Sequence, residues 1–163
     1  MTTSPGRDLK GDAAGRLAPP DRAAIDDLLA RYCFAIDLRD WEGLREIFAR
    51  DAVITYWGPR VSTGIDQIVA FFRTTTSPVA ATQHLLHTSR VWATGPDTAE
   101  GLSHVTAHHV GHDVVLPAPE AATYTVTGTY HDQFARTGEG WRIGRRTLTL
   151  LTSAGDPAIL RRR

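Results

Sequence analysis

Apolar residues recur at helical spacing in the first third of the chain. After Pro20, the positions spaced by three or four are Ile25, Leu28, Leu29, Tyr32 and Ile36. This period places them on one face of a helix, and a proline in the first turn is typical of a helix start. The pattern therefore predicts an amphipathic helix over residues 20–38.

Two further helices and a strand are predicted next. A short helix follows Asp40, whose carboxylate can accept backbone N–H bonds as an N-cap. Its apolar stripe is Trp41, Leu44, Ile47 and Phe48. The stretch RDAVITYWG, residues 50–58, has strand chemistry. Residues 62–76 predict a third helix, with Ser62 or Thr63 as its cap.

The second half of the chain has the composition of strands. From residue 82 onward β-branched and aromatic residues dominate, and the turn signals TGPDTAEG, LPAPEAA and TGEG interrupt them. The segments between these signals are 82–93, 98–116, 121–137 and 140–153. They predict an antiparallel meander. Helices followed by strands indicate the α+β class, with the sheet curled around the helices and an apolar interior face.

The length of the chain limits the number of domains, and its net charge limits the kind of ligand. The 163 residues suit one domain and are too few for two ordinary cores. We expect that domain over residues 20–155, after a disordered leader, 1–19, and before a basic tail, 156–163. Lys+Arg and Asp+Glu both number 18, so no net field attracts nucleic acid or an anionic membrane. A small, weakly polar ligand is the expected partner.

The sequence favours a cytoplasmic location. No segment approaches the roughly 20 apolar residues of a membrane span, and the N-terminal stretch lacks the apolar core of a signal peptide. The single cysteine, Cys33, excludes an intramolecular disulfide, which fits a reducing compartment. Cys33 lies among apolar residues of the first helix, where a buried inert thiol is expected.

All seven histidines lie between residues 84 and 131, which indicates a polar pocket wall within the sheet. Side chains along a strand alternate between its two faces. On the first long strand His84 therefore points to one face and His87 to the other. On the next strand His109 shares the apolar face of Val105 and Ala107, which marks it as interior. The outward-facing group is His104, His108 and His112.

The stretch HVTAHHVGH raises the alternative of a zinc site, because a spacing of four suits two ligands on a helix. On a strand the same spacing separates side chains by about 13 Å, too far for one ion. We therefore expect no metal.

Several separated motifs resemble one known superfamily. The stretch ARYCFAIDLRDWEGLREIFARDAVITYWG is similar to the opening of SnoaL-like, or nuclear transport factor two-like, proteins. GIDQIVAFF, TQHLLHTSRV and GWRIGRRTLTLL resemble its later landmarks. The resemblance covers residues 20–155 and implies a cone-shaped, curved antiparallel sheet wrapped around N-terminal helices.

Within this superfamily the chain is most similar to scytalone dehydratase and the bile-acid dehydratases. Their pocket carries a Tyr and an Asp of the first helix, a Tyr at the end of the first strand, and a His. The corresponding residues here are Tyr32, Asp37, Tyr56 and His84. A further pocket His of the scytalone enzyme aligns with His109. Its later Asn aligns with Tyr130, a departure that argues against the same substrate but not against elimination.

These residue types also support acid–base chemistry by themselves. If Asp37 faces the pocket, a bond to His84 or His109 would fix the tautomer of that ring and raise its basicity. Such a dyad can remove a proton next to a carbonyl and return one to a leaving hydroxyl. Tyr32 and Tyr56 can donate hydrogen bonds to the carbonyl oxygen. For each residue a structural role, as helix-end Asp, bonded core His or core Tyr, is the alternative.

Other chemistries lack a signal. The sequence contains no Gly-x-Ser-x-Gly, phosphate-binding loop or dinucleotide fingerprint, so no cofactor is expected. The candidates for substrate binding are Trp57, Phe71, Leu86, Val105, Tyr124, Tyr130 and Leu148.

Three functions follow as hypotheses. The first is a cofactor-independent lyase that dehydrates a small hydrophobic substrate, a hydroxylated cyclic ketone of steroid-like or polyketide origin. The second is an isomerase or polyketide cyclase with the same proton shuttle, which product mass separates because only dehydration loses water. The third is a non-catalytic ligand-binding or structural subunit. The outward face of the sheet carries Thr, Trp and His, so we also expect a homodimer or homotrimer.

Overall fold

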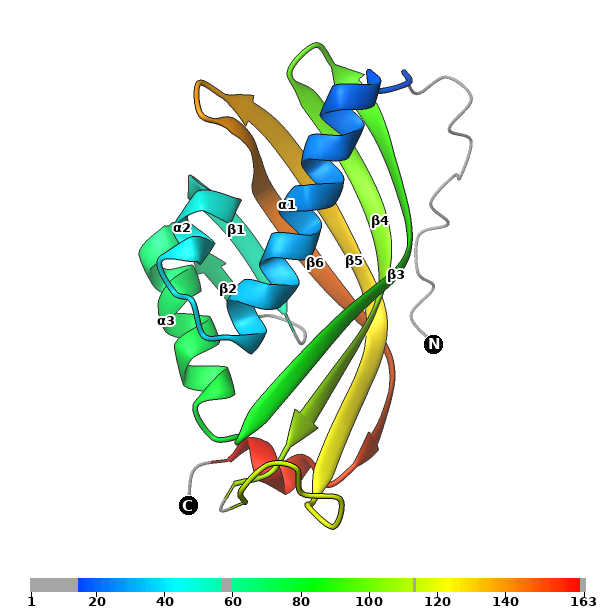
Figure 1. The fold of residues 1–163 in the computed structure, drawn as a ribbon. Helices are drawn as coiled ribbons and strands as arrows, with labels where there is room; N and C mark the ends of the chain where they lie inside the picture. The colour runs from blue at the N-terminus through cyan, green and yellow to red at the C-terminus, as the bar shows by residue number, and fades with distance from the viewer. Residues whose placement is uncertain (1–14, 57–59, 113, 162–163) are drawn as a thin grey trace.

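A six-stranded mixed sheet curls around a long helix (Figure 1). The computed structural model describes residues 15–56, 60–112 and 114–161. The helices are α1 (Pro19–Asp37), α2 (Gly43–Ile47), α3 (Ile65–Thr76) and the 3-10 helix η1 (Pro157–Leu160). The strands are β1 (Phe48–Tyr56), β2 (Arg60–Thr63), β3 (Ala81–Gly95), β4 (Thr98–Val110), β5 (Thr123–Thr137) and β6 (Gly140–Gly155). The α+β class expected from the sequence is confirmed.

The strand order is β2-β1-β6-β5-β4-β3. Strands β3 to β6 pair with their chain neighbours in antiparallel fashion, so the predicted meander is confirmed. Strand β1 pairs with β6 in parallel, and β2 pairs antiparallel with β1. The sheet is curled but not closed, and α1 lies across its concave side (Figure 1). Inward side chains of the long strands therefore face the helix.

Helix α1 buries the face that its apolar period predicted. Its buried residues are Ile25, Leu28, Leu29, Tyr32, Cys33, Ala35 and Ile36. Pro19 occupies the first turn, where its fixed φ suits a helix and its missing N–H is not needed. The apolar face of α1 packs against the concave face of the sheet. This packing, and not helix propensity alone, stabilises the helix.

A tight turn ends α1 and sets its distance from β3. Arg39 has a φ of 59°, a left-handed conformation unusual for a residue with a side chain. The backbone N–H of Asp40 donates to the carbonyl of Ala35 at 2.8 Å across this turn. The Arg39 guanidinium donates to the carbonyl of Val79 at 2.6 Å, just before β3. These bonds hold the last residue of α1, Asp37, against the beginning of β3.

The second helix is shorter than predicted. Helix α2 begins at Gly43, and Phe48 is the first residue of β1 instead of the last apolar residue of the helix. The bond expected of Asp40 is present, because its Oδ1 accepts from the backbone N–H of Gly43 at 2.9 Å. Glu42, however, occupies the N-cap position.

The predicted cap of the third helix is wrong. Ser62 and Thr63 belong to β2, a strand that the sequence pattern did not indicate, and they pair with Ile54 and Val53 of β1. Gly64, with a φ of 83°, takes the N-cap position of α3. This positive φ suits glycine, which turns the chain from strand to helix without a Cβ clash.

The core lies between the helices and the concave face of the sheet. Apart from α1, its large apolar members include Leu44, Ile47, Phe48, Ile54, Ile68, Phe72, Phe134 and Ile143. They come from α2, α3, β1, β5 and β6, so one core joins the helical and strand parts of the chain.

The two ends of the described chain pack onto the sheet. Gly15, which belongs to the predicted leader, pairs with Ala93 of β3. Residues 1–14 of that leader lie outside the described residues. In the predicted tail, η1 begins after Asp156, which accepts a bond from the N–H of Ala158 at 2.9 Å. Residues 162–163 of that tail also lie outside the described part. The division into leader, domain and tail stays a prediction.

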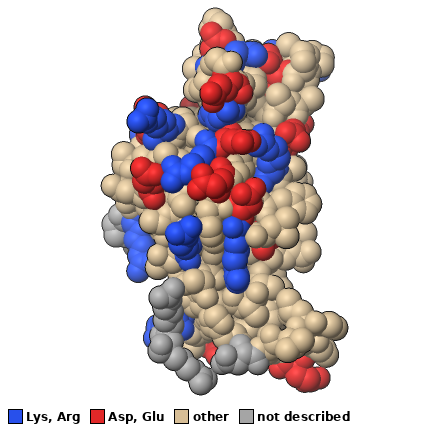
Figure 2. Space-filling view, turned by 60° about the vertical axis from the view of Figure 1, so that its left-hand side comes forward, with Lys and Arg blue, Asp and Glu red and all other residues tan. Residues whose placement is uncertain are grey.

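Charges of both signs mix on the surface. Figure 2 shows basic and acidic side chains interspersed over the upper part of one face. Ion pairs of this kind link Arg31 to Glu46 and Arg45 to Asp66. None of the helices in the described ranges is long and apolar enough to cross a membrane.

Two large apolar side chains of the sheet, Leu85 of β3 and Leu151 of β6, are exposed. Self-association of the protein stays a prediction.

Asp21 joins the beginning of α1 to the β5–β6 end of the sheet. Its carboxylate accepts from Trp141 Nε1 at 3.1 Å and pairs with Arg136 at 2.6 Å. The Arg136 guanidinium also lies 4.7 Å from the Trp141 ring centroid, a cation–π contact. Bonds from Arg136 and Trp141 lower the pKa of Asp21 below its ordinary 3.8.

We expect Asp21→Asn to lower the urea midpoint of unfolding at pH 7. Because the folded pKa of Asp21 is depressed, its carboxylate stabilises the fold above pH 3.8, and this contribution is lost as pH falls through the folded pKa. The difference between wild type and variant should therefore shrink below that pH. Asp26→Asn is the matched control, since the Asp26 pair with Arg22 on the same helix is exposed. Equal effects of both variants would contradict this role of Asp21.

Candidate active site

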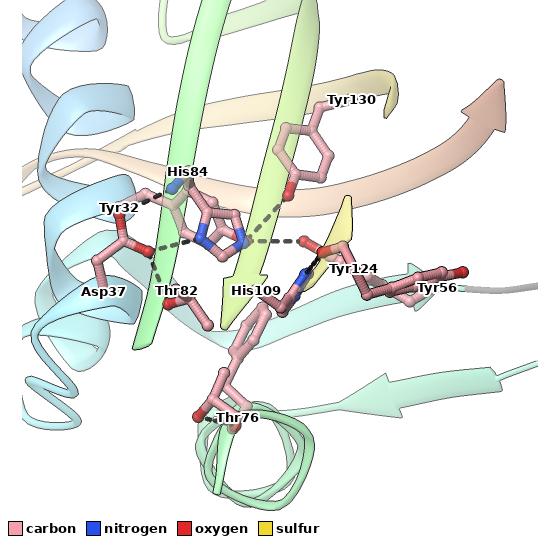
Figure 3. Close-up of polar contacts among 10 residues, drawn as sticks. Tyr32, Asp37, Tyr56, Thr76, Thr82, His84, His109, Tyr124 and Tyr130 are labelled. Carbon is pink, nitrogen blue, oxygen red and sulfur yellow. Dashed lines mark hydrogen bonds and ion pairs between the residues drawn. The ribbon is translucent and has the colours of Figure 1, made fainter. Parts of the chain in front are cut away.

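Three hydrogen bonds hold the Asp37 carboxylate against β3 (Figure 3). Its Oδ1 accepts from Thr82 Oγ1 at 2.8 Å and lies 2.7 Å from His84 Nδ1. Its Oδ2 accepts from the backbone N–H of His84 at 2.8 Å. The side chains of Asp37 and His84 are only 16% and 8% exposed. The sequence left open whether His84 or His109 pairs with Asp37, and the structure pairs it with His84.

This pairing decides which His84 nitrogen is available. The carboxylate is an acceptor, so Nδ1 carries the proton and donates it to Asp37. In the neutral ring, Nε2 then has the free lone pair. His84 also lines the pocket described below.

Asp37 is ionised at neutral pH. Burial raises the pKa of Asp37, but the bonds from the His84 ring, the His84 N–H and Thr82 outweigh it and hold this pKa below 3.8. A fixed anion beside Nδ1 stabilises the imidazolium that forms when Nε2 takes a proton. The pair therefore has the geometry of a general base and its orienting carboxylate.

His109 is the second inward histidine, as alternation predicted. Its Nδ1 donates to the backbone carbonyl of Tyr124 at 2.9 Å, and its ring centroid lies 6.3 Å from that of His84. Burial lowers the pKa of His109, and the bond to the Tyr124 carbonyl only partly offsets this. A neutral His109 therefore adds no positive charge beside the His84 ring.

Three tyrosine hydroxyls meet beside the histidines (Figure 3). Tyr32 Oη lies 3.0 Å from Tyr56 Oη and 3.2 Å from Tyr130 Oη. All three side chains are buried. Burial raises the pKa of each phenol, so all three keep their protons at neutral pH. The cluster is a set of hydrogen-bond donors in a dry environment, where such bonds are strong.

Sequence reasoning missed a buried ion pair behind these tyrosines. Arg146 Nε and Nη2 donate to the two carboxylate oxygens of Asp132 at 2.7 and 2.8 Å, and both side chains are at most 1% exposed. The guanidinium carbon lies 4.0 Å from the Tyr32 ring centroid and 4.1 Å from that of Tyr130. The one available signal was Asp132, which alternates in phase with the inward Tyr130 and Phe134.

A small pocket of about 40 Å³ lies beside the two inward histidines and the tyrosines Tyr56 and Tyr130. The predicted site residues that line it are Tyr56, Phe71, His84, His109, Tyr130 and Leu148. Thr75 and Thr76 of α3 and Leu160 of η1 complete part of its wall. This space suits a few ordered water molecules, whereas pockets for drug-sized ligands measure about 300–1,000 Å³.

Other candidates lie away from this lining. Tyr32 is fully buried behind Tyr56 and Tyr130. Val105 belongs to the core, Leu86 packs against that core, and the Tyr124 ring packs against His109. Trp57 lies outside the described residues.

The remaining histidines of β3 and β4 face away from the pocket. His87 is exposed and its Nε2 lies 2.9 Å from Thr106 Oγ1, while His108 Nδ1 lies 2.7 Å from Thr125 Oγ1. His104 is exposed. In the described part of the chain, no three His, Cys, Asp or Glu side chains are grouped to hold a metal ion.

Sequence comparison identifies the family. Residues 19–147 match the SnoaL-like domain family. The protein Rv2910c of Mycobacterium tuberculosis is 31% identical over 138 residues, which cover 79% of this chain and 84% of that relative. The chain therefore belongs to the SnoaL-like family, as its motifs implied.

Solved structures share the fold. Kfla4162 from Kribbella flavida is 26% identical and covers 86% of this chain and 96% of its own, with a TM-score of 0.74. The LinA-type3 hexachlorocyclohexane dehydrochlorinase of Novosphingobium barchaimii has a TM-score of 0.72 at 17% identity, covering 85% of this chain and 91% of its own. The second likeness concerns the fold alone.

We expect nitrogen NMR of the histidine rings to show His84 as the Nδ1–H tautomer at a pH where it is neutral. Asp37→Ala should abolish this preference, because it removes the acceptor at Nδ1. His109 is the internal control, since its Nδ1–H donates to a backbone carbonyl that the substitution leaves in place. An unchanged His84 pattern in the variant would contradict the orienting role of Asp37.

Proposed function

We propose that this protein is a cofactor-independent acid–base lyase that dehydrates a hydroxylated cyclic ketone. The observation that carries the proposal is the buried Asp37–His84 pair on the wall of a pocket that Tyr56 and Tyr130 also line. A base on one side and hydroxyl donors on the other are what proton removal next to a carbonyl requires.

The first step is proton removal from the carbon next to the substrate carbonyl. Nε2 of His84 accepts this proton, and the ring becomes an imidazolium held between the pocket and the Asp37 carboxylate. The three bonds to Asp37 fix the ring before the substrate arrives, so little reorganisation is needed during the reaction.

The second step is stabilisation of the enolate. The electron pair of the broken C–H bond moves onto the carbonyl oxygen, where tyrosine O–H groups donate hydrogen bonds to it. Bonds of this kind act best in a water-excluded site, and Tyr56 and Tyr130 are 4% and 2% exposed.

In the last step the imidazolium gives its proton to the β-hydroxyl, which leaves as water while the enolate collapses to a conjugated ketone. The proton taken from carbon thus leaves with the hydroxyl, and His84 returns to its neutral form. Loss of hydrogen chloride, the reaction named in the LinA-type relative, is likewise an elimination. Return of the proton to another carbon would instead give an isomer.

The pocket volume bears on how substrate enters. A cyclic ketone of steroid-like or polyketide type is larger than a space of about 40 Å³. Binding therefore requires the wall to move, and Leu160 of η1 is the wall residue nearest the end of the chain. A larger cyclic substrate thus implies displacement of side chains at the wall.

The test is mass-resolved turnover of β-hydroxy ketones of steroid and aromatic polyketide types. We expect loss of water by wild type, and a decrease of about 10²–10⁴-fold in kcat/KM for His84→Ala and Asp37→Asn. His87→Ala is the matched control, because His87 lies on the same strand but faces outward, and it should keep wild-type turnover. Circular dichroism checks that each variant is folded.

Each outcome separates one hypothesis from the others. A product of unchanged mass, still dependent on His84, would indicate an isomerase or cyclase. Dehydration retained in both site variants would overturn the assignment of Asp37 and His84. Binding of a ketone without any product would favour the ligand-binding subunit.

A further inference from the structure

The three clustered tyrosines do not have equal access to the pocket. Tyr56 and Tyr130 line it, whereas Tyr32, with 0% exposure, lies behind them and contacts both hydroxyls. A substrate oxygen in this pocket therefore meets Tyr56 or Tyr130, and Tyr32 acts through one of them. This division was not visible in the sequence, which assigned Tyr32 and Tyr56 as the donors.

Proton counting leaves two arrangements of the cluster. Each phenol has one O–H donor, and Tyr32 sits between two hydroxyls, so it can donate to only one of them. If Tyr32 donates to Tyr130 and accepts from Tyr56, the proton of Tyr130 is free to point at a ligand. If the direction is reversed, Tyr32 donates to Tyr56 and accepts from Tyr130.

The charge behind the cluster favours the first arrangement. The Arg146 guanidinium lies 4.1 Å from the Tyr130 ring centroid and 4.0 Å from that of Tyr32, so its positive charge is directed at these two phenols. Two of its nitrogens bind Asp132, and the third, Nη1, has no hydrogen-bond partner among the described residues. Negative charge that builds up near Tyr130 is therefore stabilised more directly than near Tyr56.

The pKa values of the pocket phenols reflect the same Arg146 charge. Burial raises the pKa of Tyr130, but Arg146 and the hydrogen bonds with Tyr32 and Tyr56 oppose the increase. Burial also raises the pKa of Tyr56, where the interaction with Tyr130 adds to the increase and Arg146 and the hydrogen bond with Tyr32 oppose it. At Tyr130 the Arg146 charge is the largest influence that opposes burial, as its position over this ring implies.

We propose that Tyr130 is the catalytic hydroxyl that binds the carbonyl oxygen of the substrate, with Tyr32 and the Arg146–Asp132 pair as positioning residues behind it. The inference rests on the proposed function, whose oxyanion it assigns to one residue. Tyr130 keeps its proton and donates a hydrogen bond to the enolate oxygen, while His84 holds the proton taken from carbon. Tyr56 is the far end of the hydroxyl chain.

The test uses 4-nitrophenolate, a planar oxyanion that resembles an enolate and whose absorbance reports its environment. Its dissociation constant is measured by absorbance titration, at a pH where the probe is ionised, for wild type and for the Tyr130→Phe, Tyr32→Phe and Tyr56→Phe variants. We expect Tyr130→Phe to weaken binding by about 10²-fold, the magnitude associated with one oxyanion donor. Tyr32→Phe should have a smaller effect, and Tyr56→Phe the smallest.

This ranking distinguishes a hydrogen-bond chain from a packing role, because each variant keeps its ring and removes only one oxygen. Tyr32→Phe should also shift the absorbance maximum of the bound probe, since Tyr130 loses its donor. If Tyr130→Phe fails to fold, the proposal is tested by the absorbance shift in Tyr32→Phe and by whether Tyr32→Phe weakens probe binding more than Tyr56→Phe does. A largest effect at Tyr56, equal effects, or no binding of 4-nitrophenolate to wild type would each overturn the proposal.

Binding of 4-nitrophenolate does not require turnover, so this experiment tests the oxyanion site separately from the proposed dehydratase activity. Wild type that dehydrates ketones while Tyr130→Phe binds the probe normally would retain the lyase and exclude Tyr130. Probe binding that depends on Tyr130, in a protein that dehydrates nothing, would retain the oxyanion site and exclude the dehydratase.

Discussion

The carboxylate of Asp37 connects the end of α1 to β3 and orients the His84 ring. It is the last residue of the helix, and its oxygens accept from a side chain, a backbone N–H and a ring nitrogen of β3. Those bonds fix the position of the helix end along the strand and the rotation of His84 together. The left-handed turn at Arg39, held to the Val79 carbonyl, keeps the chain from extending the helix past this point. A shift of one residue in either element would separate the pair.

The interior of this sheet contains polar and charged side chains as well as apolar ones. A buried ion pair and three phenols lie beside an apolar core, and breaking such a pair leaves an unpaired buried charge. Buried ion pairs add little net stability compared with apolar groups of the same shape. The apolar core therefore supplies the stability, and the polar cluster lies beside the pocket that Tyr56 and Tyr130 line. Local rules that a fold breaks in this way usually mark functional sites.

Much of this arrangement is contained in the periodicity of the sequence. The helical period identified α1, alternation along β4 placed His109 inside, and alternation along β3 separated His84 from His87. The choice between those two rings was not predictable, because it depends on where α1 stops beside β3. Alternation also fails at β6: Trp141 and Ile143 face inward, so simple counting points to Arg145. A bulge between the Gln133–Arg145 and Phe134–Ile143 pairs shifts the phase and turns Arg146 inward instead. Pocket volume depends on many side chains at once and has no local signal.

The Asp132–Arg146 pair also constrains how this protein can change over time. Either residue, once replaced alone, leaves its partner charged and enclosed, at a cost of about 3–5 kcal/mol. Most small domains have only about 5–15 kcal/mol of stability to lose. The two positions, 14 residues apart in the chain, are therefore expected to change together during evolution. Descendants can keep both charges or exchange both for apolar residues, and the bulge that brings Arg146 inward must be inherited with them.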